Sequence, residues 1–252
     1  MVTMDPQIAV LDRFFSAYLD CDISRVTPGG VWVVPSDRRD RAELHYENVF
    51  ALWLLASGNR CVVSVQRPLE AAVKRAVARL DLAGFRAEPG QKLLRDAVAS
   101  GLRKDARIVS GPVLNCTART FRPEIEHRCR RVTSSDLSAL RRVGLYGGWL
   151  AKSVEEGTCF AACVDGEPVA LAGTYEVPHM AHEVCDLCVP GTVPEHRREG
   201  YGRAVVACAT RAVLESGRVP VYVTSDQNVA SIHTARSVGY TQYGWSLRIE
   251  LV

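Results

Sequence analysis

The chain has 252 residues, of which 47% are hydrophobic and 23% charged, and its formal net charge is +3. This composition is typical of an ordinary globular protein with room for one large domain or two small ones. The small net charge does not indicate nucleic-acid binding, which usually needs a concentrated basic face. No leader pattern opens the chain, and no apolar run approaches the roughly 18 residues of a membrane span. We therefore expect a cytoplasmic protein without a membrane partner.

Helices and strands alternate in the first half. Helical spacing of apolar residues is seen at Pro6–Leu19, Glu47–Ala56, Pro68–Leu80 and Lys92–Leu102. Strand-like runs are Gly30–Val34, Cys61–Val65, Arg107–Val109 and Val113–Leu114. The charged stretch Arg119–Glu126, which contains Pro123, then predicts a boundary, so that residues 1–126 form an N-terminal α/β domain.

The second half, residues 127–252, has clearer element signals. Thr133-Ser134-Ser135-Asp136 is an N-cap cluster before a helix, and Asp165-Gly166 is a hairpin turn between two strands. Expected strands are Arg128–Val132, Cys159–Val164, Pro168–Glu176, Glu183–Val189, Val219–Thr224 and Trp245–Val252. Expected helices are Leu137–Val143, Trp149–Val154, Gly202–Ser216 and Asn228–Val238. The order of elements predicts a mixed α/β (α+β) fold.

The nine cysteines do not indicate a disulfide framework, because several lie in apolar runs. Cys185-x-x-Cys188 has a spacing found in zinc sites. On a strand, however, those two side chains face opposite sides, and no second pair follows at suitable spacing. We therefore expect no metal. We also expect Cys185, Cys188 and Cys208 to pack in the core, because nothing in the sequence places an activating base beside them.

The segment Arg197-Arg198-Glu199-Gly200-Tyr201-Gly202-Arg203 separates a strand-like run from a helix. A glycine-spaced turn that opens a helix directs backbone N–H groups and the helix dipole at one spot. Three arginines add charge, so the segment predicts a pyrophosphate cradle. A Walker A motif is excluded because Arg203-Ala204 replaces Lys-Ser/Thr, and Val205 stands where a dinucleotide fingerprint has its third glycine.

The spacing Arg197-x-x-Gly200-x-Gly202 resembles the pyrophosphate-binding motif of the GNAT family of N-acetyltransferases, and Pro194-Glu195-His196 is similar to the usual lead-in. Downstream, Asn228-Val229-Ala230-Ser231 and then Gly239-Tyr240 resemble the family's helix after its fifth strand. The resemblance covers about Arg128 to Val252. It implies a GNAT-like domain with a splayed central sheet at residues 127–252, where the arm of acetyl-coenzyme A slots against the fourth strand. The N-terminal domain is then a lid, a part of the acceptor pocket or a degenerate second GNAT-like copy.

The resemblance also implies a set of residues that bind the coenzyme. They are Val189, Gly191, Thr192, Arg197, Arg198, Glu199, Gly200, Tyr201, Gly202, Arg203, Asn228 and Ser231. The 3′-phospho-ADP end of coenzyme A is anionic, which suits N–H groups and arginines. An ordinary helix N-cap remains the alternative role for Asn228, and an ordinary first-turn position the alternative for Ser231.

Acyl transfer to an amine needs a base, and a carboxylate on the fourth strand serves in one branch of the family. Counting back from the arginine motif gives Asp186, with Glu183 as the alternative on the opposite face. Two residues depart from the family pattern. Ala235 stands where many members have a tyrosine acid, with His233 and Tyr240 nearby. Pro190 has no N–H for the acyl carbonyl, so either a bulge lets Cys188 or Val189 donate or that contact differs here.

The sequence therefore predicts an N-acyltransferase that moves an acyl group, most simply acetyl, from coenzyme A directly to an amine of a small molecule or peptide. One alternative is the same fold with an aminoacyl-tRNA or carrier-protein donor. The modest net charge of the chain does not favour the tRNA donor. The other is a non-catalytic module that senses acyl-coenzyme A. The sequence does not distinguish a monomer from a homodimer.

Overall fold

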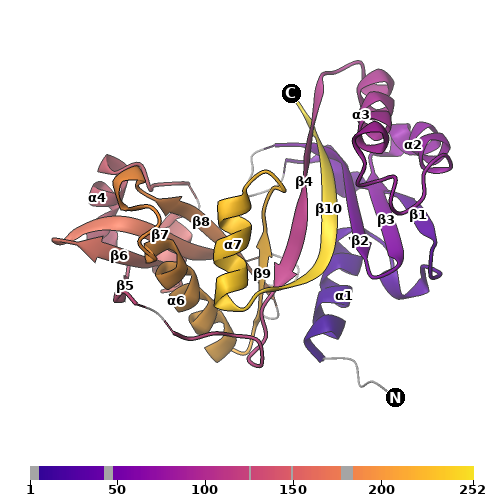
Figure 1. Cartoon of the computed structure of the whole chain (residues 1–252). Helices are drawn as coiled ribbons and strands as arrows, with labels where there is room; N and C mark the ends of the chain where they lie inside the picture. Colours follow the sequence, from indigo (N-terminus) through magenta and orange to yellow (C-terminus); the bar gives the residue numbers. More distant parts are fainter. Residues whose placement is uncertain (1–5, 43–47, 125, 149, 177–183) are drawn as a thin grey trace. The chain divides into compact units, whose positions relative to one another are not determined.

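The computed structural model describes residues 6–42, 48–124, 126–148, 150–176 and 184–252 (Figure 1). The chain forms two compact units. Unit 1 comprises Met1–Val113, Thr224–Gln227 and Tyr243–Val252, and unit 2 comprises Leu114–Val223 and Asn228–Gln242. The predicted boundary at residue 126 thus falls inside unit 2, and most of the last strand belongs to unit 1. The roles expected for the two parts remain predictions.

Unit 1 is a sheet with helices on both faces. Its helices are α1 (Pro6–Tyr18), α2 (Glu70–Val77) and α3 (Glu88–Leu102). Its strands are β1 (Val31–Pro35), β2 (Phe50–Ser57), β3 (Arg60–Val65), β4 (Ala106–Asn115) and β10 (Thr241–Leu251), in the order β1-β3-β2-β10-β4. β1 is parallel to β3, whereas β2 is antiparallel to both β3 and β10.

Alternate residues of unit 1's strands pack on its two faces. Leu52 and Leu54 of β2 belong to a core with Val73 of α2 and Leu94 of α3. Trp53, between them, lies edge-on to the ring of Tyr18 of α1. An aliphatic layer therefore joins the sheet to α2 and α3, and an aromatic layer joins it to α1.

The helix predicted at Glu47–Ala56 is wrong: residues 50–57 form β2. Six consecutive residues, Phe50–Leu55, are buried because both faces of this central strand are covered. A strand buried on both faces is a continuous apolar run, which periodicity cannot distinguish from a buried helix. The better signal was Gly58-Asn59, the two-residue turn that joins β2 to β3.

Unit 2 contains the segment from Arg197 to Arg203. Its strands are β5 (Cys129–Arg131), β6 (Phe160–Val164), β7 (Glu167–Glu176), β8 (Val184–Thr192) and β9 (Val219–Val223), in the order β9-β8-β7-β6-β5. Its helices are α4 (Leu137–Arg142), α5 (Leu150–Glu155), α6 (Tyr201–Glu215) and α7 (Val229–Val238). The pairs from β5 to β8 are antiparallel, and only β8 and β9 are parallel, joined through α6. The result is the expected mixed fold.

The two faces of unit 2's sheet have separate cores. Ala170 and Ala172 of β7 pack with residues of α6 and α7, such as Val205 and Val238. Leu171, between them, packs with residues of α4 and α5. The small alanines on the first face allow α6 to lie close to the sheet, so its first turn is held against the end of β8.

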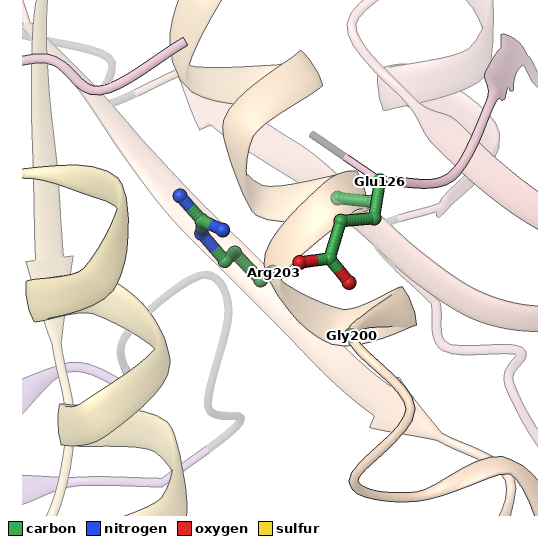
Figure 2. Close-up of a pocket in the computed structure, with 4 residues that line it drawn as sticks. Glu126, Gly200 and Arg203 are labelled. Atoms are coloured by element: carbon green, nitrogen blue, oxygen red, sulfur yellow. The ribbon is translucent and has the colours of Figure 1, made fainter. Parts of the chain in front are cut away.

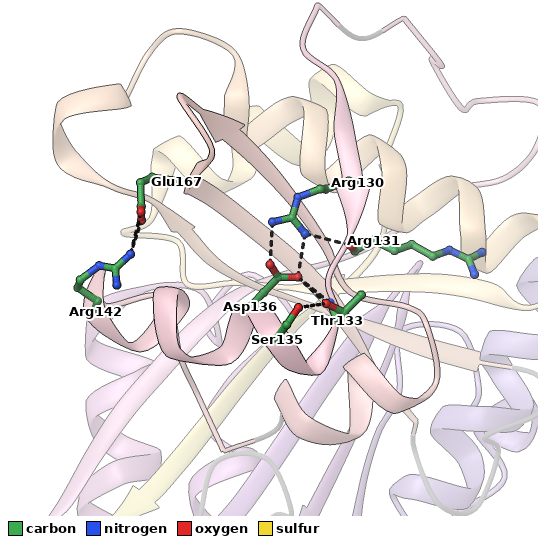
Figure 3. A network of polar contacts seen from close by, with 7 residues as sticks. All are labelled: Arg130, Arg131, Thr133, Ser135, Asp136, Arg142 and Glu167. Atoms are coloured by element: carbon green, nitrogen blue, oxygen red, sulfur yellow. Dashed lines mark hydrogen bonds and ion pairs between the residues drawn. The ribbon is translucent and has the colours of Figure 1, made fainter.

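A polar network fixes the short 3₁₀ helix Ser134–Asp136, which leads directly into α4 (Figure 3). Asp136 accepts two hydrogen bonds of 2.8 Å from the guanidinium of Arg130 and one of 2.8 Å from the backbone N–H of Thr133. This arrangement is a capping box, as the cluster Thr133–Asp136 predicts. The guanidinium and the N–H hold the pKa of the Asp136 carboxyl well below its usual range.

Within the described residues, no helix is both long and apolar enough to cross a bilayer.

Candidate functional site

The strands β8 and β9 separate part of the way along their length. Their parallel pairing runs from Val184↔Val219 to Asp186↔Val221 and stops there, although both strands continue. Beyond that point the edge of β8 has no neighbour from β9, so backbone groups on this edge are open to a ligand. The separation creates a V-shaped opening in the sheet of unit 2.

A groove of about 1050 Å³ occupies this opening. Its described lining residues come from β8, the following loop, the start of α6, β9 and α7. They are Val189, Gly191, Thr192, Pro194, Glu195, Arg197, Arg198, Gly200, Gly202, Arg203, Tyr222, Asn228, Ala230, Ser231 and Thr234. A groove of this size can hold a large, elongated small molecule.

The groove ends at the N-terminus of α6. Gly200 is the N-cap, with φ of +91°, and no side chain caps the first turn. Arg198 is also left-handed, with φ of +66°, which is uncommon for a residue other than glycine. Uncapped N–H groups of a first helical turn form a concave site for an anion, reinforced by the helix dipole. A Cβ at Gly202 would lie 3.1 Å from Oγ1 of Thr192, so a larger residue there would require the Thr192 side chain or the helix to shift by a few tenths of an ångström.

Three arginines surround this turn. The Nε of Arg197 donates to the backbone oxygen of Thr192 at 3.2 Å, which ties the loop to the end of β8. Arg198 is exposed at the groove. The Nε of Arg203 is buried, and no atom of the described residues accepts a hydrogen bond from it. Burying a donor without an acceptor costs free energy, which an anionic ligand that accepts from Nε would recover. Arg203 is therefore suited to bind an anion.

A smaller cavity of about 50 Å³ lies beside the same turn, lined by Glu126, Gly200, Arg203 and Ala204. Figure 2 shows the Glu126 carboxylate beside this turn and the Arg203 guanidinium pointing away from that carboxylate. The adjacent His127 stacks on the ring of Tyr201, with centroids 3.9 Å apart, and its Nε2 lies 2.5 Å from the backbone oxygen of Glu199. His127 therefore contacts the loop at Glu199 and Tyr201, which are not among the described residues that line the groove.

The opposite wall of the groove is formed by β9 and α7. Asn228 caps α7, because its side-chain oxygen accepts from the N–H of Ser231 at 3.2 Å. The hydroxyl of Ser231 lies 2.7 Å from that of Tyr222, in the last part of β9. The N-cap alternative for Asn228 is thus confirmed, and a role toward a ligand stays a prediction because Asn228 also lines the groove.

The bulge considered for Pro190 is present. Leu171 pairs with Gly191 and Gly173 pairs with Cys188, so two residues of β8, Val189 and Pro190, face the single residue Ala172 of β7. The extra residue bends β8 next to the point where it leaves β9. The bulge therefore shifts the register near Val189, which lines the groove.

The predicted base and acid positions are only partly described. The backbone of Asp186 forms the last pair between β8 and β9, and its side chain is outside the described atoms. Glu183 lies outside the described residues.

Candidates for the acid do not reach the groove. Ala235 is fully buried, and His233 is exposed and not among the groove residues. The hydroxyl of Tyr240 lies 2.8 Å from that of Thr210 inside the core. Cys208 does not line the groove either, although the hydrogen bond from Cys129 and the charge of Arg211 lower its pKa to about 7.

Most of the residues predicted to bind the coenzyme come together. Ten of them line the groove: Val189, Gly191, Thr192, Arg197, Arg198, Gly200, Gly202, Arg203, Asn228 and Ser231. Glu199 and Tyr201 instead contact His127 behind the loop. Sequence reasoning missed Tyr222, Thr234 and Glu126. No motif marks these three residues, because their position depends on how the sheet opens and how the segment near residue 126 packs.

Comparisons with known proteins agree with this geometry. Residues 124–240 match the family model for the acetyltransferase (GNAT) family. No curated protein sequence matches the chain. The C-terminal half of the chain, at residues 124–240, thus matches a GNAT acetyltransferase domain, as its motifs predict.

One solved structure extends the likeness in fold to nearly the whole chain. An acetyltransferase of the GNAT family from Colwellia psychrerythraea aligns with a TM-score of 0.54 at 14% identity, covering 97% of each chain. A GNAT-family protein from Novosphingobium aromaticivorans aligns at 0.46 and 20% identity, over 57% of this chain and 66% of that one. A protein from Salmonella typhimurium, solved with its cofactor acetyl-CoA, aligns at 0.39 and 15% identity, over 50% of this chain and 93% of that one. The first of these shows that the N-terminal part is included in a GNAT-type fold.

Proposed function

We propose that this chain is an N-acyltransferase that transfers an acyl group, most simply acetyl, from coenzyme A directly to an amine. The observation that carries the proposal is the groove between β8 and β9, which leads from the opening of the sheet to an uncapped helix N-terminus. One end of the groove suits an anion and the other reaches the last strand pair. Coenzyme A has matching ends, with phosphates at one end and the thioester at the other.

In this proposal the first turn of α6 holds the pyrophosphate. Backbone N–H groups of residues 201–203 and the guanidinium of Arg203 donate to its oxygens, and Arg197 and Arg198 supply further positive charge. The pantetheine arm is peptide-like, so its amides pair with the open edge of β8 between Val189 and Thr192. The donor is thereby aligned along the strand.

The acyl carbonyl then lies at the bulge. Since Pro190 has no N–H, the donor to this carbonyl is the N–H of Val189, which the bulge displaces from regular pairing with β7. Asp186, at the last pair of β8 and β9, takes the proton of the attacking amine, with Glu183 as the alternative base. The acceptor is a small molecule or a peptide.

Turnover tests this proposal. The purified protein is incubated with acetyl-coenzyme A and a panel of amines that includes polyamines, amino acids and short peptides, and free thiol is measured. We expect at least one amine to raise thiol release well above the rate without acceptor. Binding of acetyl-coenzyme A without any turnover would support a sensing module instead. Absence of binding would contradict the proposed donor and leave a carrier-protein or aminoacyl-tRNA donor to be tested.

A further inference from the structure

The groove contains a pair of hydroxyl groups to which the proposed reaction has so far given no role. Tyr222 is the tyrosine among the described groove residues, and its hydroxyl lies 2.7 Å from the Oγ of Ser231. The Tyr222 side chain is only 3% exposed and belongs to the core that joins the sheet to α6 and α7. The burial of the ring and the hydrogen bond to Ser231, which also lines the groove, hold the Tyr222 hydroxyl in one place.

The position of this pair matches the end of the groove where chemistry is proposed. Val221 forms the last pair with Asp186, so Tyr222 is the first residue of β9 beyond the point where the strands separate. On the facing strand, Val189 of the bulge lines the same groove. The pair therefore lies at the closed end of the opening, away from the exposed arginines of the loop.

Ser231 is positioned to pass a proton onward. Its N–H is held by the Asn228 side chain at 3.2 Å, in the first turn of α7, and its Oγ faces Tyr222. Of the two hydroxyls, the phenol is the stronger acid, with an ordinary pKa of about 10. When Tyr222 donates to Oγ of Ser231, the serine's own hydrogen is left to point toward the groove.

We propose that Tyr222 is the proton source for the leaving thiolate of coenzyme A and that Ser231 delivers the proton. This inference rests on the proposed function. As the bond between the acyl carbon and sulfur breaks, the Ser231 hydroxyl gives its proton to sulfur. Its Oγ takes the proton of Tyr222, and the tyrosinate later recovers a proton from water. This pair, on β9 and α7, thereby supplies the proton to sulfur that neither Ala235 nor Tyr240, whose hydroxyl lies in the core, can supply.

Three substitutions test the inference with an acceptor from the amine panel. Tyr222→Phe removes the proton source and keeps the ring. Ser231→Ala removes the relay, and Ser231→Thr keeps a hydroxyl there. The matched control is Tyr240→Phe, which removes a tyrosine hydroxyl from the same core, where it is bound to Thr210. The measurements are the Kd for acetyl-coenzyme A by calorimetry and kcat over a range of pH.

General acid catalysis typically contributes about 10²–10⁴-fold to a rate. We expect Tyr222→Phe to lower kcat by about 100-fold or more, with the Kd for acetyl-coenzyme A within about 2-fold of wild type. The fall in kcat at alkaline pH, where the wild-type phenol ionises, should disappear in this variant. Ser231→Ala should also lose most of kcat, Ser231→Thr should restore much of it, and Tyr240→Phe should match wild type.

The outcomes separate this inference from the proposed function. A wild-type protein that does not bind acetyl-coenzyme A overturns both. Normal binding and turnover with full kcat in Tyr222→Phe overturns only the proton source, and full kcat in Ser231→Ala overturns only the delivery. A wild-type protein that binds acetyl-coenzyme A and releases no free thiol overturns the inference while leaving the binding site in place.

Discussion

Arg203→Ala should weaken binding of acetyl-coenzyme A strongly while leaving the fold intact. Arg203 lies in the first turn of α6 and lines the groove, and its buried Nε has no acceptor among the described residues. A hydrogen bond to a charged group contributes about 1.5–3 kcal/mol, which corresponds to about a 10- to 150-fold change in Kd. Removing a donor that has no partner in the free protein should not lower stability. Calorimetry measures the Kd, and thermal unfolding checks the stability.

The matched control is Arg211→Ala on the same helix. This substitution removes the same charge, but Arg211 donates to the backbone oxygen of Pro123 and does not line the groove. It lies roughly 12 Å further along the helix axis, beyond the Debye length of about 8 Å at physiological ionic strength. We expect its Kd to stay within about 2-fold of wild type. S-acetylpantetheine, which lacks the phosphates, should bind both variants and wild type alike.

Two results would refute this reasoning. If Arg203→Ala binds acetyl-coenzyme A as tightly as wild type, the first turn of α6 does not hold the phosphates. If Arg211→Ala loses as much affinity as Arg203→Ala, the effect reflects overall charge and not a specific contact.

Three further predictions concern the local structure. Gly200→Ala should lower the free energy of unfolding by about 1–2 kcal/mol in urea denaturation, because its φ of +91° is left-handed; a loss below about 0.5 kcal/mol would contradict this. Asp136→Asn should cost about 1 kcal/mol at pH 7. Because the folded pKa of Asp136 is depressed, that difference should shrink as the pH falls below about 4, and an unchanged difference at pH 2 would argue against the network. Among the described cysteines, Cys208 should react fastest with iodoacetamide, at a rate that rises through about pH 7, and peptide mapping that finds another cysteine first would contradict this.

The sequence predicted the features that depend on neighbouring residues. The hairpin at Asp165-Gly166 and the capping box from Thr133 are local, because backbone conformation and short-range hydrogen bonds decide them. The loop before α6 is similar: its glycines and arginines lie within seven residues, so their spacing is readable. The family resemblance of this motif and of the motif at Asn228 implies twelve residues that bind coenzyme A, and ten of them line the groove.

Features that depend on distant parts of the chain were missed or left open. The sequence predicts a helix where β2 lies, because the burial of β2 on both faces comes from α1 on one side and from α2 and α3 on the other. Tyr222 was missed because nothing near it in sequence shows where β8 leaves β9. The bulge at Val189-Pro190 depends on the register in which β8 pairs with Leu171 and Gly173 of β7. The sequence alone does not fix that register, so it predicted the bulge as one of two alternatives.

The most direct test of the central claim is a calorimetric titration of the wild-type protein with acetyl-coenzyme A, with acetyl phosphate as the control ligand. We expect one binding site per chain for acetyl-coenzyme A, lost or strongly weakened in Arg203→Ala, and no comparable binding of acetyl phosphate. Folded wild-type protein that gives no binding of acetyl-coenzyme A would contradict this claim.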